Sequence, residues 1–111
     1  MQTIIELSER QRKLIDIIQR TRQLRDEIII YLASQRDDVE NHQTLQKSYP
    51  DSKKLPTQIA FFKEQITTEV ELLNRIQTIL TGYEKMLKNV DDKIKALSQG
   101  LSTPSLRAME V

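Results

Sequence analysis

The fold is decided by residues 59–101, which read IAFFKEQ ITTEVEL LNRIQTI LTGYEKM LKNVDDK IKALSQG L when they are divided into groups of seven. The first residue of every group is Ile or Leu, and the fourth is apolar or Tyr except at Glu69. Alternating spacings of three and four residues are typical of a helix that packs along another helix. We therefore predict a long helix over residues 56–99, and we call its first and fourth positions the C-terminal seam. Pro56 fits the first turn, where a helix does not use the backbone N–H.

A second long helix is predicted for residues 1–48, beginning with a cap in which Thr3 and Glu6 satisfy free backbone amides of the first turn. Its apolar residues also repeat every seven positions. We call two positions of this repeat, a first position and a companion position three residues later, the N-terminal seam. The first position holds Leu7, Leu14, Thr21, Ile28 and Gln35, the companion holds Arg10, Ile17, Leu24, Tyr31 and Asp38, and Ile4, Ile18, Leu32 and Val39 flank them. Because polar residues dominate from Ser34 onward, residues 34–48 are predicted as either helix or loop.

The segment Tyr49-Pro50-Asp51-Ser52 predicts a turn over residues 49–55, because proline disfavours helical backbone in the residue before it and Asp and Ser form local bonds. Two helices of similar length joined by a short turn form an antiparallel hairpin. Gly100 and Pro104 predict the end of the second helix, followed by a flexible tail over residues 100–111. The sequence leaves open whether this tail is a binding motif.

The predicted fold class is all-α: an antiparallel helical hairpin of two long helices that forms a coiled coil or a multi-helix bundle with partner chains. Partner chains are predicted because apolar residues extend beyond the seams, for example at Leu72, Ile79 and Met86. A single neighbouring helix covers only a narrow stripe, so the wider apolar surface needs further helices.

Folding the chain about Ser52 pairs apolar residues of the two helices, for example Ile28 with Ile76. Near the turn, Phe61 and Phe62 face a polar stretch and are candidates for contact with another chain. The predicted interface comprises Leu14, Ile17, Leu24, Ile28, Tyr31, Leu32, Phe61, Phe62, Ile66, Leu72, Leu73, Ile76, Ile79, Leu80, Tyr83, Met86, Leu87, Val90, Ile94 and Leu97.

Composition argues against an enzyme. The 111 residues include no Cys, two Gly and a single histidine, His42, so they offer no thiolate, no glycine-rich phosphate loop and no histidine-based metal or nucleophile cluster. We predict no catalytic, cofactor or metal site. Seventeen basic residues nearly cancel sixteen acidic ones, so no global charge attracts nucleic acid or membranes. The lack of a signal-peptide pattern and of a long apolar run predicts an intracellular protein of the cytoplasm or nucleus.

These features predict a non-enzymatic structural or adaptor subunit that assembles through its helices with partner proteins, with hetero-oligomers favoured over homo-oligomers. In outline the pattern resembles coiled-coil subunits of cytoskeletal, kinetochore and spindle assemblies, vesicle tethers and nuclear-pore scaffolds, and the resemblance covers architecture alone. The alternative is a small nucleic-acid-binding or regulatory helical module that uses a basic face within residues 10–25. That face would consist of Arg10, Arg12, Lys13, Arg20, Arg22 and Arg25.

Overall fold

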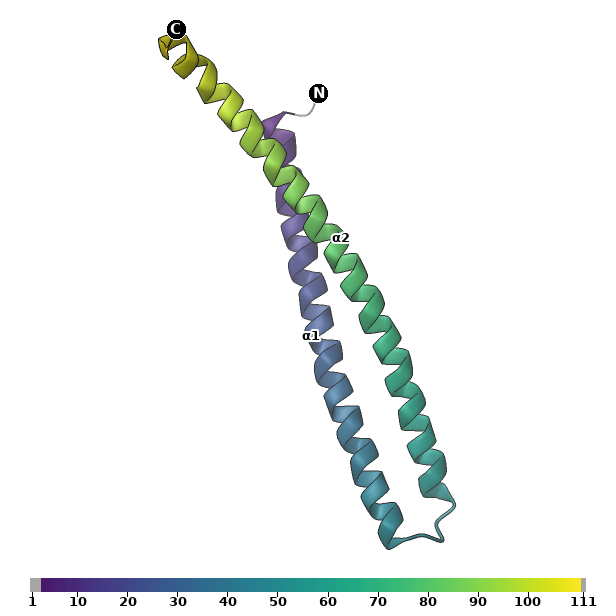
Figure 1. The fold of residues 1–111 in the computed structure, drawn as a ribbon. Coiled ribbons are helices and arrows are strands. Elements are labelled where there is room, and N and C mark those ends of the chain that lie inside the picture. The colour runs from purple at the N-terminus through teal and green to yellow at the C-terminus, as the bar shows by residue number, and fades with distance from the viewer. Residues whose placement is uncertain (1–2, 111) are drawn as a thin grey trace. The chain divides into compact units, whose positions relative to one another are not determined.

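The chain forms two long helices in the computed structural model, which describes the backbone of residues 3–110 and the side chains of residues 3–99. Helix α1 spans Ile4–Ser48 and helix α2 spans Lys54–Glu110, and they pack against each other (Figure 1). Residues 3–110 contain no strand. The predicted all-α class with two packed long helices is confirmed, and residues 34–48 are helical.

Local hydrogen bonds explain where the helices begin and meet. The Glu6 backbone N–H donates to Thr3 Oγ1 at 3.1 Å, so Thr3 caps α1 as predicted. After α1, the Ser52 N–H donates to the Tyr49 carbonyl at 3.1 Å and closes the turn. The Leu55 N–H then donates to Ser52 Oγ at 3.4 Å, which caps the start of α2. The two helices are therefore joined by residues 49–53, inside the segment that the sequence places at 49–55.

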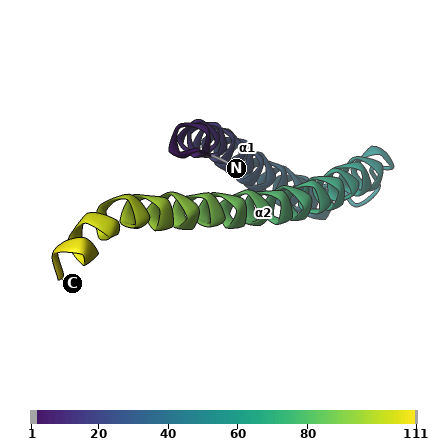
Figure 2. The ribbon, with the colours of Figure 1, turned by 90° about the horizontal axis from the view of Figure 1, so that it is seen from above.

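The C-terminal end of α2 differs from the sequence prediction, because the helix continues past Gly100 and Pro104 to Glu110. A glycine ends a helix when it adopts a positive φ, and no glycine of the described backbone does so. A proline inside a helix removes one backbone hydrogen bond and kinks the helix without necessarily ending it. Figure 2 shows the last turns of α2, in yellow, bending away from the preceding helix axis.

The chain divides into two compact units, each of which contains a segment of both helices. The terminal unit comprises Met1–Thr21 with Ile79–Val111, and the turn unit comprises Arg22–Thr78. In the terminal unit, the buried residues Leu7, Leu14 and Val90 form one apolar cluster, against which Tyr83, Leu87 and Ile94 pack. In the turn unit, Ile28, Leu32 and Ile76 form a second cluster, against which Ile66, Val70 and Leu73 pack. Each unit thus has its own small core between α1 and α2.

Candidate protein-interaction surface

The C-terminal seam lies where the sequence predicts it, on the face of α2 that packs against α1. Its buried members are Ile59, Ile76, Leu80 and Val90, and its half-buried members are Phe62, Ile66, Glu69, Leu73, Tyr83, Leu87 and Ile94. Leu97, the last seam residue with a described side chain, is exposed. The strict spacing was sufficient to identify this face, because nearly every position on it is apolar.

The N-terminal seam has a different companion position from the predicted one. The companion lies four residues after the first position, so the face of α1 that packs against α2 carries the buried residues Leu7, Leu14, Ile18, Ile28, Leu32, Gln35 and Val39. Ile17, Leu24 and Tyr31, predicted on the seam three residues on, are exposed instead. Leu32, rather than Tyr31, packs in the Ile28 cluster between the two helices.

The predicted interface residues therefore fall into three groups. Leu14, Ile28, Leu32, Ile76, Leu80 and Val90 are buried between the two helices. Phe62, Ile66, Leu73, Tyr83, Leu87 and Ile94 are half-buried. Ile17, Leu24, Tyr31, Phe61, Leu72, Ile79, Met86 and Leu97 are exposed. The first two groups hold the chain's own helices together, and the third is available to another chain.

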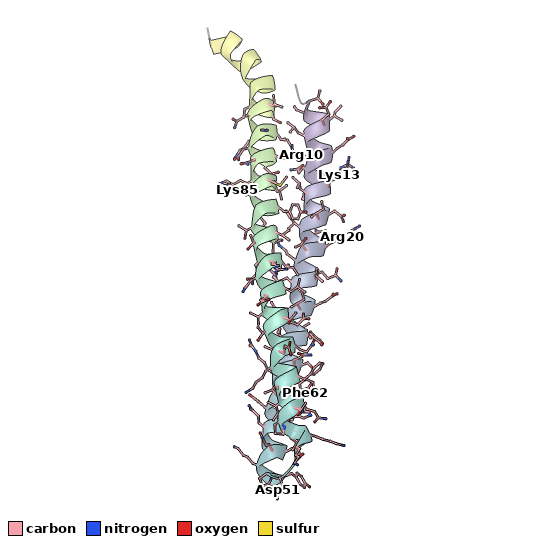
Figure 3. The ribbon with its side chains drawn as sticks, turned by 90° about the vertical axis from the view of Figure 1, so that its right-hand side faces the viewer. Arg10, Lys13, Arg20, Asp51, Phe62 and Lys85 are labelled. Atoms are coloured by element: carbon pink, nitrogen blue, oxygen red, sulfur yellow. The ribbon has the colours of Figure 1, made fainter. Side chains whose placement is uncertain are left out.

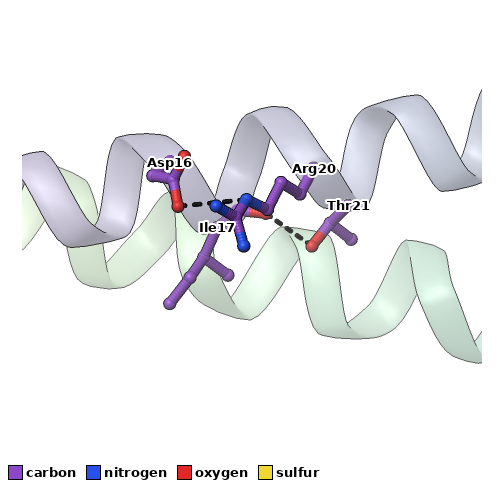
Figure 4. Close-up of polar contacts among 4 residues, drawn as sticks. All are labelled: Asp16, Ile17, Arg20 and Thr21. Atoms are coloured by element: carbon purple, nitrogen blue, oxygen red, sulfur yellow. Dashed lines mark hydrogen bonds and ion pairs between the residues drawn. The ribbon is translucent and has the colours of Figure 1, made fainter.

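Polar side chains occupy four of the ten N-terminal seam positions from Leu7 to Val39 and are satisfied mostly within the chain. Gln11 Nε2 donates to Asp91 Oδ1 across the helices at 2.7 Å. Thr21 Oγ1 donates to the carbonyl of Ile17 one turn back at 2.7 Å (Figure 4). A hydroxyl group that donates to a carbonyl of its own helix needs no hydrogen-bond partner on the other helix. The seam of α1 is thus less apolar than the seam of α2 that it faces.

Gln35 is the buried polar residue in which this arrangement is incomplete. Its Nε2 donates to the Tyr31 hydroxyl at 2.6 Å, whereas Oε1 has no partner among the described residues. We expect Gln35→Leu, which removes the unsatisfied oxygen and keeps the side-chain volume, to stabilise the fold by about 1 kcal/mol. Such a gain raises the melting temperature of a domain of this size by about 4–8 °C. Thermal unfolding followed by circular dichroism measures it.

The matched control for this substitution is Gln43→Leu, because Gln43 is exposed on the same helix. The control should leave the melting temperature nearly unchanged, since surface substitutions typically alter stability by less than about 0.5 kcal/mol. A lower melting temperature for Gln35→Leu than for the unmodified chain would show that the Gln35 amide stabilises the fold, despite its unsatisfied oxygen.

Aromatic residues near the turn are partly covered within the chain. The rings of His42 and Phe62 lie 4.9 Å apart between centroids, and Phe61 meets Phe62 edge-on at 5.9 Å. His42 Nδ1 also bonds to the Asp38 carbonyl at 2.7 Å, which fixes the imidazole in place. The expectation that both phenylalanines lack cover is therefore wrong for Phe62, because the polar stretch it faces includes this ring. Phe61 remains exposed.

Each unit leaves an apolar stripe uncovered beside its core. In the terminal unit the stripe consists of Ile17 on α1 with Ile79 and Met86 on α2. In the turn unit it consists of Leu24 and Tyr31 on α1 with Leu72 on α2. Every one of these residues directly precedes a seam residue in sequence, so it lies at the edge of the packed face. We call these groups the terminal-unit stripe and the turn-unit stripe.

The basic residues of α1 within residues 10–25 belong to both units: Arg10, Arg12, Lys13 and Arg20 to the terminal unit, and Arg22 and Arg25 to the turn unit. Lys13 and Arg20 extend outward from α1 in Figure 3, and Arg20 Nε contacts Asp16 Oδ2 at 3.2 Å (Figure 4). In the turn unit, Arg25 contacts the neighbouring Asp26 at 3.1 Å. Arg20, Asp16 and Asp26 are exposed and Arg25 is half-buried, so both pairs add little stability, and each places a carboxylate beside a cation.

Within the described side chains, no three His, Cys, Asp or Glu residues lie close enough together to hold a metal ion. None of the described helices is both long and apolar enough to cross a membrane. No protein-family model, no curated protein and no solved structure matches the chain.

Proposed function

We propose that this protein is a non-enzymatic structural or adaptor subunit, which joins a larger helical assembly through the apolar stripes beside its own helix-helix cores. The partners are other proteins, and hetero-oligomers are favoured over homo-oligomers. The larger assembly is a scaffold of the cytoskeletal, kinetochore or spindle, tethering or nuclear-pore type.

The observation that carries this proposal is the distribution of apolar residues on α1. The outer position at residues 10, 17, 24, 31, 38 and 45 holds four apolar or aromatic residues that are exposed, Ile17, Leu24, Tyr31 and Leu45. The seam position at residues 11, 18, 25, 32, 39 and 46 holds only three, Ile18, Leu32 and Val39. A helix whose outer edge is at least as apolar as its packed edge is typical of a chain that meets more than one helix.

The experiment is sedimentation of the purified chain over a range of micromolar concentrations. We expect the average mass to rise with concentration, because the turn-unit stripes of two copies associate when the natural partner is missing. A double substitution in the turn-unit stripe, Leu24→Glu with Leu72→Glu, should keep the chain monomeric and equally helical, since both side chains are exposed. An unmodified chain that stays monomeric at every concentration, with helicity unchanged, would contradict the proposal.

The nucleic-acid alternative predicts a different response to salt. Binding through phosphate contacts weakens steeply as salt rises, whereas association through Leu, Ile and Met side chains does not. No aromatic residue lies among the basic residues of α1 to stack on bases. We therefore favour the protein-assembly role.

A further inference from the structure

We infer that the terminal-unit stripe is the docking site for an acidic amphipathic helix of another protein. This inference rests on the proposed assembly function and specifies the chemistry of one partner. Four observations carry it: the stripe's position, the charges around it, a glycine beside it and the effect of symmetry on a second copy.

The position of the stripe follows from the register of the two helices. Ile17, Ile79 and Met86 each stand one residue before a seam residue, namely Ile18, Leu80 and Leu87. In each case the next seam residue follows after three positions, so the three stripe residues occupy the same place in the repeat. Equivalent flanking positions of two antiparallel helices lie on the same side of their contact. The stripe is therefore one apolar strip shared by α1 and α2 within the terminal unit.

The charges around the stripe are predominantly positive. The surface positions that share this side of the terminal unit are residues 6, 10, 13 and 20 on α1 and residues 82, 89, 93 and 96 on α2. They hold Glu6, Arg10, Lys13, Arg20, Gly82, Asn89, Lys93 and Ala96. The single carboxylate, Glu6, lies beyond Arg10 toward the N-terminus, so the four cations are nearer in sequence to the stripe residues. Asp16 reaches Arg20 from the next face of α1, through an exposed pair that water screens. A partner with Glu or Asp beside its own apolar stripe complements this pattern.

Gly82 supplies a reason for a helix, rather than a loop or a nucleic acid, to occupy the stripe. A glycine in a helix costs about 1 kcal/mol relative to alanine. A Cβ at Gly82 would meet nothing within 4 Å, so packing inside the chain does not require the glycine. Gly82 lies three residues after Ile79 and four before Met86, in the middle of the stripe's edge on α2. The missing side chain lets the backbone of a neighbouring helix approach closely.

A second copy of the chain fits the stripe less well than a different protein. A twofold dimer through this side would place the same surface on both partners. Arg10, Lys13, Arg20 and Lys93 of one copy would then meet the same cations of the other, and like charges repel. An acidic helix avoids this cost and gains complementary pairs instead. The charge pattern therefore favours a heteromeric contact.

Synthetic helices test the inference directly. The probe is a peptide of about three heptads, roughly 32 Å long at ~1.5 Å per residue, with Leu on its apolar positions and Glu beside them. The matched peptide carries Lys in place of every Glu. We expect the Glu peptide to bind the full chain at least tenfold more tightly than the Lys peptide at about 0.15 M salt, where charges remain effective over about 8 Å. Fluorescence anisotropy of the labelled peptides measures both affinities.

Three substitutions locate the site. Ile79→Glu should remove binding of the Glu peptide, whereas Ile29→Glu should not, although the two isoleucines are similarly exposed at 51% and 45%. Gly82→Leu should weaken binding at least tenfold while leaving helicity unchanged, because the space beside Gly82 is open within the chain. Circular dichroism confirms that each variant is folded.

The outcomes separate this inference from the function on which it rests. Equal affinity for the Glu and Lys peptides would overturn the acidic partner and leave the assembly role standing. Equal loss of binding in the Ile79→Glu and Ile29→Glu variants would overturn the location. A chain that binds neither peptide and stays monomeric in sedimentation would overturn both the inference and the assembly role. Displacement of the Glu peptide by single-stranded oligonucleotide at equal concentration would assign the cations to nucleic acid and overturn the inference.

Discussion

Leu80→Asp should remove most of the helical signal of this protein. Leu80 is 4% exposed and belongs to the C-terminal seam, where the neighbouring seam residues Ile76 and Tyr83 are apolar or aromatic. An ionised carboxylate placed there loses its hydration without gaining a partner, which costs several kcal/mol. Small domains are stable by about 5–15 kcal/mol, and a short chain with two thin cores lies toward the lower end. Circular dichroism at 222 nm measures the loss.

The adjacent residue provides the control for this substitution. Ile79 is 51% exposed, so the aspartate of Ile79→Asp keeps its contact with water. We expect that variant to retain the helicity of the unmodified chain, because surface substitutions change stability by about 0.5 kcal/mol or less. The same helical signal in both variants would show that Leu80 does not lie in a packed face. The two results together test the seam of α2 at single-residue resolution.

The sequence was most informative for α2 because its packed face is chemically uniform. Eleven of the twelve seam positions from Ile59 to Leu97 are apolar or Tyr, so a single register satisfies the pattern. The turn was equally predictable from the sequence, since proline, Asp and Ser restrict the backbone through local effects. Contacts that depend on side-chain placement across the helices were harder to predict. The tilted ring contact between His42 and Phe62 could not be predicted from a polar stretch and an aromatic pair in sequence.

The register of α1 was misread for a physical reason that bears on function. A seam is recognised in sequence by its apolar residues. It can be assigned to the correct positions only where the outer positions of the helix are polar. In α1 the outer position that includes Ile17, Leu24 and Tyr31 is more apolar than the packed position, which includes Gln11, Arg25 and Gln46. The surface that misleads the count is the surface for which we propose a partner chain. A failure of local rules at a functional surface is expected, because such residues serve the assembly rather than the isolated fold.

Ile18→Ala and Ile17→Ala decide between the two registers of α1. Ile18 is 3% exposed and Ile17 is 37% exposed, although they are the same residue type at consecutive positions. Truncating a buried isoleucine to alanine removes its apolar contacts and leaves a cavity, so Ile18→Ala should cost about 2–5 kcal/mol. Ile17→Ala should cost less than about 1 kcal/mol, because alanine also favours the helix more than isoleucine does. Urea unfolding followed by circular dichroism gives both values.

The same pair separates folding from assembly. Ile17→Ala removes part of the terminal-unit stripe without disturbing the core of Leu7, Leu14 and Val90, so it should weaken binding of the Glu peptide more than it weakens the fold. Ile18→Ala should do the reverse: the fold loses stability, while the remaining folded molecules keep an intact stripe. If Ile17→Ala instead proved the more destabilising of the two, the companion position would lie three residues on. The outer stripe of α1 would then be part of the chain's own core, and the surface proposed for the partner would not exist.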